Sequence, residues 1–345
     1  MAGHAGLSRY AVGGLERGNV RSALLWLEKS GDTTSHLHLA GALYWFWYVR
    51  GPIREGRSWL ERALAEPATL APDVPRVKAL VWAGMLAHYQ GDDERAQEWL
   101  ETSLTQCQEL EDPWWRALTL GILGAVAEDR GDYPAAETLI AEALALFRAV
   151  DDRANSALAM LHLGIVAWGQ GDVNRATTLC TEAVELQREE GEAWGLSNSL
   201  AYLGLLAEEA GDHDRAATLH RESLELRWEA GAWEDVAGSL ADLATLAAAV
   251  ERLEQAARLF GAANALLGEA GRSLKLPERA TYERAEASVR HALGEEAFAE
   301  AYADGRALPR KQAVAEATAL ADEIAQPRAD HSAVSSKSES RSILN

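Results

Sequence analysis

Histidines and paired carboxylates are the residues of this sequence whose types could do metal or acid–base chemistry. The closest histidines, His36 and His38, lie two positions apart, and on a helix two such side chains point in different directions. The carboxylate pairs Glu128–Asp129 and Glu208–Glu209 are adjacent in sequence, so on a helix they also diverge, and solvated faces are their ordinary place. No nucleophile elbow, glycine-rich dinucleotide loop or HExxH helix occurs in the sequence. We therefore expect no catalytic site, metal or cofactor.

The Gly171-Asp172 step could hold a phosphate or metal, or it could form a tight turn between helices. The same step recurs every 40 residues, at Gly91-Asp92, Gly131-Asp132 and Gly211-Asp212. A phosphate or metal site would occur once, with convergent ligands, whereas a turn can repeat. We interpret the glycine as the left-handed end of one helix and the aspartate as the N-cap of the next.

Other positions keep the same 40-residue register over about 215 residues without an insertion. The residues that mark this register, called turn residues below, are Gly51, Gly91, Gly131, Gly171, Gly211 and Glu251. Seven positions before them stand Tyr44, Gly84, Gly124, Gly164, Gly204 and Ala244. Five positions after them stand Gly56, Ala96, Ala136, Ala176, Ala216 and Ala256, and eight after them Trp59, Trp99, Leu139, Leu179, Leu219 and Leu259. Small residues let two helices approach closely while the large residue fills the space beside them.

This register predicts an all-α fold, a tetratricopeptide-repeat solenoid with about six helix-turn-helix repeats wound into a right-handed superhelix. Tetratricopeptide repeats have a nominal period of about 34 residues. We expect the additional residues of each unit to lie in the joints between units, such as residues 111–115 and 191–195.

The pattern also predicts the domain limits. The repeats cover residues 36–271, after a flexible N-terminus at 1–15 and an N-terminal capping helix at 16–35, where Gly18-Asn19, Ala23 and Trp26 keep the repeat spacing. A helical C-terminal cap follows at 272–326, with helices expected at 277–293, 295–304 and 309–325. The serine-rich tail at 327–345 has few core-forming residues, so we expect disorder there.

The charge and hydropathy of the chain exclude several classes of partner. The net charge of −20 disfavours nucleic acid and anionic membranes. The longest apolar run, residues 37–49, has 13 residues and is too short to span a bilayer as a helix. The N-terminus lacks the features of a secretory signal, which predicts a cytoplasmic location. Cys107 and Cys180 have no metal-ligand spacing, and we expect Cys180 to be a core residue without a disulfide.

The ends of the repeat region resemble a known family. Residues 15–32 (LERGNVRSALLWLEKSGD) and 38–65 are similar to the opening of the repeat region in bacterial signal-transduction ATPases with numerous domains, including LuxR-type regulators related to the maltose-regulon activator. Residues 254–308 are similar to the end of that region, and the whole resemblance covers about residues 15–320. It implies the sensor part of a bacterial transcriptional or signalling regulator.

The ATPase and DNA-binding domains of such regulators are not part of this resemblance. A Walker A loop needs a lysine directly after a glycine, and every lysine here follows another residue type, so nucleotide binding is not carried over. Residue 327 lies about where a DNA-binding domain could begin, which leaves open both a fragment of a larger regulator and a stand-alone module.

The candidate binding surface is the face of each first helix that points away from its own repeat core. Positions 13, 10, 6, 3 and 2 before the turn residue fall on that face. The predicted groove residues are Trp45, Tyr48, Lys78, His88, Tyr89, Glu128, Asp129, Trp168, Asn198, Glu208 and Glu209. Met85 also falls on this face, and for Leu161, Ile165 and Leu205 we favour packing against the neighbouring repeat.

Aromatic platforms mixed with carboxylates suit a peptide or protein segment that carries basic and apolar groups. The sequence therefore predicts a non-enzymatic binding module whose groove takes a peptide, protein or small inducer. The alternative is a stand-alone adaptor that joins two proteins and has no connection to transcription.

Overall fold

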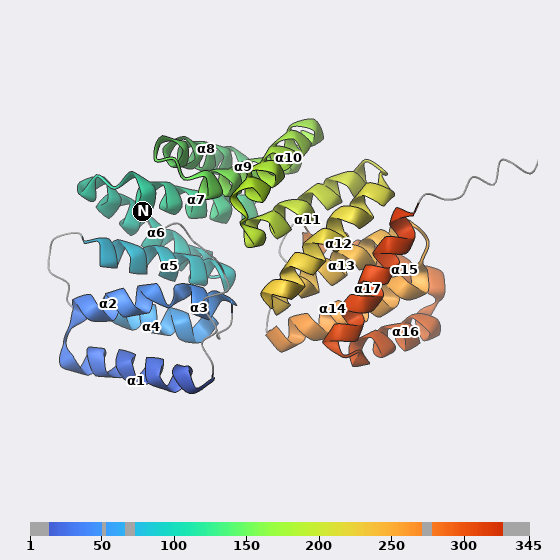
Figure 1. Cartoon of the computed structure of the whole chain (residues 1–345), viewed down its shortest axis with the longest axis horizontal. Helices are drawn as coiled ribbons and strands as arrows, with labels where there is room; N and C mark the ends of the chain where they lie inside the picture. Colours follow the sequence, from blue (N-terminus) through green and yellow to red (C-terminus); the bar gives the residue numbers. More distant parts are fainter. Residues whose placement is uncertain (1–13, 50–52, 66–72, 271–277, 327–345) are drawn as a thin grey trace, which may run out of the picture.

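The computed structural model describes residues 14–49, 53–65, 73–270 and 278–326, and all regular structure in these ranges is helical (Figure 1). The N-terminal helices are α1 (Gly14–Ser30), α2 (Thr33–Ala42), α3 (Tyr44–Val49), α4 (Ile53–Ala65), α5 (Val74–Tyr89) and α6 (Asp93–Leu110). The central helices are α7 (Pro113–Asp129), α8 (Tyr133–Ala149), α9 (Arg153–Gly169), α10 (Val173–Glu190), α11 (Ala193–Glu209) and α12 (His213–Ala230). The last helices are α13 (Trp233–Ala249), α14 (Leu253–Ala270), α15 (Glu278–Leu293), α16 (Glu295–Ala307) and α17 (Arg310–Ala325). None of the described helices is both long and apolar enough to span a bilayer.

The recurring glycine-aspartate step forms the turn within each repeat. Gly171 has a φ of +85°, in the left-handed region that glycine adopts at little cost. The Asp172 carboxylate accepts a hydrogen bond from the Arg175 backbone N–H at 3.0 Å and so caps α10. Gly131 and Asp132 make the same turn before α8. The interpretation of the step as turn chemistry is confirmed.

The joints between repeats are as short as the turns within them. Glu111 (φ +50°) and Asp151 (φ +56°) adopt the left-handed conformation, and the aspartates that follow them cap α7 and α9. The expectation that the additional residues lie in the joints is therefore wrong. They lengthen the helices, which have 16 to 18 residues from α5 to α14. One left-handed residue and one N-cap are enough to reverse the chain, so additional residues can extend the packed helices instead.

Helix pairs stack along the described part of the chain, and small residues set the distance between the two helices of a pair. A Cβ placed on Gly164 in α9 would lie 2.7 Å from Cys180 Sγ in α10 and 3.3 Å from the Ala176 carbonyl oxygen. Gly84 makes the same close approach to Leu100 in the α5–α6 pair. Cys180 is a buried free cysteine, and its burial raises its pKa to about 12, so it behaves as a small core residue.

The first repeat differs from the others because its first helix is divided into α2 and α3. Tyr44 begins α3 at the position where later repeats carry glycine or alanine. Its ring stacks on Trp82 of α5, with centroids 3.5 Å apart. Trp47, only 1% exposed, then fills the space over Gly56 of α4. Aromatic packing here replaces the close glycine contact of the later repeats.

The last three helices close the C-terminal end of the solenoid and lie where the sequence predicts them. α16 packs against α14, and α17 returns to contact α12 and α13 (Figure 1). The α14–α16 crossing depends on two glycines: a Cβ on Gly261 would overlap the Tyr302 carbonyl, and one on Gly305 would overlap the Arg258 carbonyl. The tail beyond residue 326 and the first 13 residues, for which we predicted disorder and flexibility, lie outside the described residues.

Candidate functional site

The first helices of the repeats line the inner wall of the superhelix. In sequence order α5 contacts α7, α7 contacts α9, α9 contacts α11 and α11 contacts α13. The second helices α6, α8, α10 and α12 have no comparable contacts with one another. Elements on the inside of a curve approach more closely than those on the outside, so the first helices form the concave side. The predicted groove residues all belong to these first helices.

Two of the predicted pairs meet across neighbouring first helices by one geometric rule. The residue three positions before a turn contacts the residue two positions before the next turn. His88 Nε2 of α5 lies 3.1 Å from Asp129 Oδ2 of α7, and Trp168 Nε1 of α9 donates a hydrogen bond to Glu209 Oε2 of α11 at 2.5 Å. Side chains chosen by their spacing thus pair along the inner wall.

A further position, nine residues before the turn, also lies on this wall and was missed in the sequence. His162 Nδ1 is 3.0 Å from Glu128 Oε2, and the Tyr202 ring lies 6.5 Å from the Trp168 ring, edge to face. Asp242 occupies the same position in α13. Helical periodicity indicates this position, because the residues nine and two positions before the turn residue are seven residues apart and lie on the same side of a helix.

A buried charged cluster lies behind the C-terminal half of the wall. His220 of α12 is fully buried; its Nε2 lies 2.7 Å from Glu208 Oε1, and its Nδ1 lies 4.0 Å from Asp242 Oδ2. Burial lowers the pKa of His220, but the Glu208 hydrogen bond and the charges of Asp242 and Glu208 outweigh it, so the pKa is raised. Burial also raises the pKa of Asp242. These groups hold Glu208 in place, so its carboxylate is part of the fold.

Asn198 belongs to the same region. Its Oδ1 accepts a hydrogen bond from Arg227 Nη2 at 2.9 Å, while Arg227 Nη1 donates to Ser239 Oγ at 2.8 Å. Arg227 is only 9% exposed, so it links three helices under the wall. Asn198 is therefore a support for a buried guanidinium as well as a wall residue.

The N-terminal half of the wall is aromatic. Tyr48 of α3 is 7% exposed, and its hydroxyl lies 3.3 Å from that of Tyr89. The Tyr48 ring also meets the Trp194 ring of α11 edge to face, with centroids 6.2 Å apart. Lys78 of α5 is half-buried, and burial lowers its pKa. The side chain of Trp45 lies outside the described residues.

The predicted groove residues differ in how accessible they are. Tyr48 and His88 are buried, and His88 is held between Asp93 Oδ1 at 2.8 Å and Asp129. The half-buried members are Lys78, Tyr89, Glu128, Asp129, Trp168, Asn198 and Glu208, and Glu209 is exposed. Leu161 and Ile165 are 2% and 4% exposed and pack in the core, whereas Met85 and Leu205 are half-buried. Trp168 and Glu209 thus combine an accessible aromatic edge with an accessible carboxylate.

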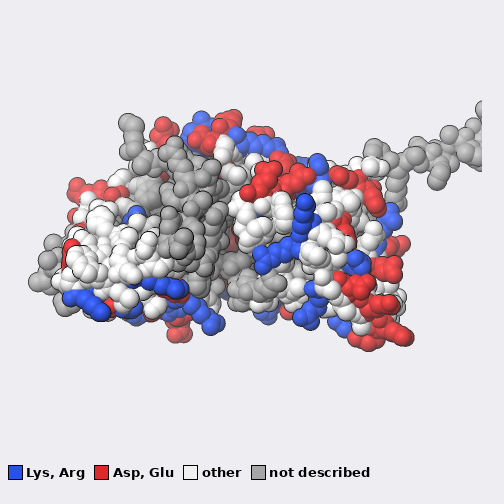
Figure 2. Space-filling model, turned by 60° about the horizontal axis from the view of Figure 1, so that its bottom comes forward, with Lys and Arg blue, Asp and Glu red and all other residues white. Residues whose placement is uncertain are grey.

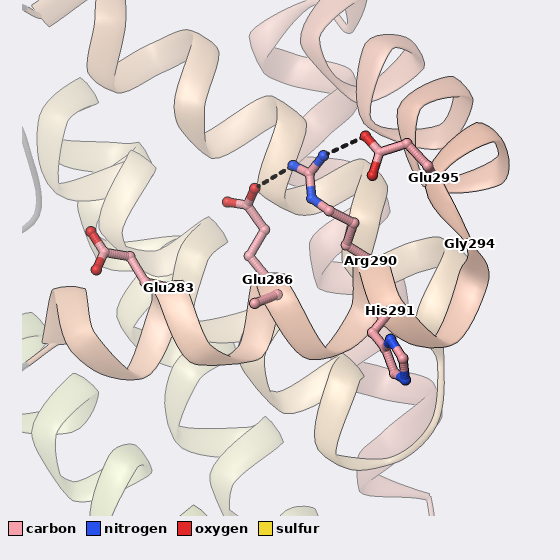
Figure 3. A pocket seen from close by; sticks show the side chains of 7 residues that line it. Glu283, Glu286, Arg290, His291, Gly294 and Glu295 are labelled. Atoms are coloured by element: carbon pink, nitrogen blue, oxygen red, sulfur yellow. Dashed lines mark hydrogen bonds and ion pairs between the residues drawn. The ribbon is translucent and has the colours of Figure 1, made fainter.

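An open pocket lies at the corner of α15 and α16, among the C-terminal helices. Its lining residues are Glu283, Glu286, Ala287, Arg290, His291, Gly294 and Glu295 (Figure 3). Arg290 bridges two of its carboxylates, with Nη2 3.1 Å from Glu286 Oε1 and Nη1 2.8 Å from Glu295 Oε1. Acidic side chains gather around this C-terminal end of the molecule (Figure 2). Among the described residues, no group of three or more histidine, cysteine or acidic side chains could hold a metal ion.

Comparison with known proteins agrees with this geometry. The family model described as tetratricopeptide repeat matches residues 76–149, 115–189 and 155–229. The chain therefore contains tetratricopeptide repeats, and its fold is an all-α tetratricopeptide-repeat superhelix. No curated protein matches the sequence.

Several solved structures share the fold at low sequence identity. A Rap protein complexed with Competence and Sporulation Factor is 11% identical, with 89% of this chain and 99% of that chain covered and a TM-score of 0.56. The apo form of RapI is 13% identical, with coverages of 74% and 98% and a TM-score of 0.51. A signal transduction ATPase with numerous domains from Pyrococcus horikoshii, which has a tetratricopeptide repeat sensor, is 13% identical over 83% of this chain, with a TM-score of 0.50. The match covers 46% of that protein.

Proposed function

We propose that this protein is a non-enzymatic binding module whose inner wall takes a peptide or protein segment with basic and apolar groups. The observation that carries the proposal is the cluster of Trp168, Tyr202 and Glu209 on neighbouring first helices. The indole and phenol rings offer apolar surface, and the exposed carboxylate beside them favours a cation. Glu128 and Asp129 extend the acidic character of the wall toward the N-terminus.

We further propose that the module is the sensor or protein-interaction region of a bacterial transcriptional or signalling regulator. Two of the structures with the same fold support this role: one is a Rap protein in complex with a factor, and the other is a signal transduction ATPase with a tetratricopeptide repeat sensor. Occupancy of the inner wall would favour one curvature of the superhelix and so change its contacts with the rest of the regulator.

Substitution of Trp168 tests the binding surface. Peptides selected from a random display library on the immobilised full chain should carry arginine or lysine beside aromatic or aliphatic residues. Trp168→Ala should weaken their binding by about tenfold, because loss of one interfacial tryptophan costs about 1–2 kcal/mol or more. The helical circular dichroism signal should stay unchanged.

Glu209→Gln tests the contribution of the carboxylate charge to binding. Trp233→Ala is the control, since Trp233 of α13 is another surface tryptophan, at 41% exposure. Glu209→Gln should reduce both the affinity and its salt dependence, and Trp233→Ala should change neither. Selection of acidic peptides, or binding that is equal in all variants, would contradict the proposed surface.

Co-purification from the native host tests the regulatory role. A regulator's sensor should recover an ATPase module or a helix-turn-helix protein, either as a partner or as part of the same polypeptide. Recovery of metabolic or secretion proteins alone would count against this role and favour a stand-alone adaptor.

A further inference from the structure

Asp242 of α13 differs from the other carboxylates of the inner wall because no described group donates a hydrogen bond to it. Each of the four predicted wall carboxylates has an imidazole or indole nitrogen of another helix within 3.1 Å. These carboxylates are Glu128, Asp129, Glu208 and Glu209. Asp242 Oδ2 lies 4.0 Å from His220 Nδ1, which is beyond hydrogen-bonding distance. The hydrogen-bonding capacity of the Asp242 carboxylate is thus unused by the described residues.

Two side chains near Asp242 carry hydrogen-bond donors, and both are engaged elsewhere. Arg227 of α12 directs its two terminal nitrogens to other groups, Nη2 to Asn198 Oδ1 and Nη1 to Ser239 Oγ. Thr245, three residues after Asp242 on the same helix, donates its hydroxyl hydrogen to a backbone carbonyl of α13 at 3.0 Å. Neither side chain therefore donates to Asp242.

A fully buried imidazole faces Asp242 across the 4.0 Å gap. His220 Nε2 is engaged by Glu208 Oε1 at 2.7 Å, whereas His220 Nδ1 has no hydrogen-bond partner among the described residues. Buried polar atoms in folded proteins nearly always have such a partner. Burial raises the pKa of Asp242, and the positive charges of His220 and Arg227 oppose this shift, while the negative charge of Glu208 adds to it. A further cation beside Asp242 would therefore be strongly favoured.

The Asp242 carboxylate is recessed but open to the inner wall. It lies nine positions before the turn residue, as His162 and Tyr202 of the wall do in their repeats, and 16% of its side chain is exposed. Its neighbours four residues before it and three and seven residues after it lie on the same face of α13 and have short side chains. They are Gly238, Thr245 and Ala249. Because these side chains leave the carboxylate uncovered, the end of a long side chain can reach it from the wall.

We propose that Asp242 receives the guanidinium or ammonium group of an arginine or lysine side chain of the segment bound on the inner wall. This assignment rests on the function proposed above and names the residue that selects a basic group of the bound segment. Both cations carry several charged N–H donors, which satisfy the carboxylate oxygens that the fold leaves unused. An acidic side chain would be repelled by Asp242 and Glu208 together.

The test combines Asp242→Asn with the basic peptides selected on the full chain. Each arginine of such a peptide is replaced by citrulline, its neutral isostere, and each lysine by norleucine. In the wild-type chain one of these replacements should weaken binding by about tenfold, and in Asp242→Asn the same replacement should cost less than about twofold. Asp214→Asn is the matched control, since it makes the same change at an exposed residue of the second helix α12. It should retain the wild-type penalty.

Proton release separates direct contact from a structural role of Asp242. A cation beside Asp242 disfavours the protonated forms of both Asp242 and His220, and the fold raises both pKa values. Peptide binding near neutral pH should therefore release protons, which calorimetry in two buffers of different ionisation enthalpy measures. The release should fall both in Asp242→Asn and with the neutral peptide. The comparison of charged and neutral peptides on the wild-type chain also holds if Asp242→Asn fails to fold.

A replacement penalty that is equal in the wild-type chain and in Asp242→Asn would overturn the assignment, and so would equal proton release by charged and neutral peptides. If Trp168→Ala still weakens binding in that case, the function proposed for the inner wall stands without Asp242. Peptide binding that is insensitive to Trp168→Ala would instead remove the proposed surface and the assignment together.

Discussion

The buried imidazole of His220 shows what a single residue contributes to this repeat architecture. His220 lies nine positions after the turn residue of its repeat. At the same position other repeats have core residues such as Leu100, Ile140 and Cys180. The sequence places a polar group in the core, which requires a partner. Its partners, Glu208 and Asp242, come from two different repeats, and only the packing of α11 and α13 beside α12 brings them into reach.

We expect His220→Gln to destabilise the protein by about 1–3 kcal/mol, because the Glu208 and Asp242 carboxylates lose the buried cationic group that they face. The raised pKa of His220 means that the folded protein holds the proton more tightly than the unfolded chain. The resulting stabilisation is complete below the ordinary histidine pKa of about 6.5 and disappears as the pH rises through the raised pKa. The difference in free energy of unfolding between wild type and variant should therefore be larger at pH 6 than at pH 9, measured by urea denaturation.

The exposed His38 of α2 provides the control. His38→Gln should cost less than about 0.5 kcal/mol at both pH values, as surface substitutions usually do. A pH-independent cost of His220→Gln would show that the imidazole is neutral in the fold and that its contribution comes from packing alone.

At the scale of elements, local chemistry predicts much of what the structure contains. The glycine-aspartate steps mark turns because a left-handed residue followed by an N-cap is specified by adjacent residues. The joints between repeats use the same left-handed residue followed by an N-cap. The sequence does not reveal it there, because the left-handed residues Glu111 and Asp151 are not glycine. The inward position of His162 and Tyr202 follows from helical periodicity, yet the contacts that make them part of the wall depend on the angle between successive repeats.

The α14–α16 crossing gives a prediction at this scale. Gly305→Ala should destabilise the protein by about 1–3 kcal/mol, since the new methyl group would overlap the Arg258 carbonyl and force the helices apart. A methyl group added at Gly268 of α14 would instead have no neighbouring atom within 4 Å, so Gly268→Ala should stabilise the protein by about 0.5–1 kcal/mol. Thermal and chemical denaturation of the two variants measures both effects. Equal shifts of the same sign would contradict the close crossing.

At the scale of the whole molecule, the curvature of the superhelix brings its first repeat into contact with its fifth. Tyr48 of α3 and Trp194 of α11 are 146 residues apart in sequence, and their rings are in edge-to-face contact. Trp194 lies at the joint after α10, where the sequence gives no sign of a distant partner. This contact joins the first repeat to the fifth.

Removing the Trp194 ring should reduce the curvature of the superhelix. We expect Trp194→Ala to increase the radius of gyration in small-angle X-ray scattering and to cost about 1–3 kcal/mol of stability, less than a fully buried tryptophan. The helical circular dichroism signal should be retained because the repeat interfaces remain intact. Trp233→Ala, at 41% exposure, should leave the radius of gyration unchanged. An unchanged radius in Trp194→Ala as well would show that the contacts between successive repeats fix the curvature by themselves.

The sequence by itself determined the helical pairs, their 40-residue register and the turn chemistry, because each depends on residues close together in the chain. It also identified the face on which Trp168 and Glu209 lie, since that face follows from helical periodicity. Only the tertiary structure decided which of those side chains are accessible, as the buried His88 and the accessible Trp168 stand at the same position in their repeats. The contact between the first and fifth repeats and the 4.0 Å gap between Asp242 and His220 were also decided there, because both depend on neighbours that small rotations between repeats bring together or leave apart.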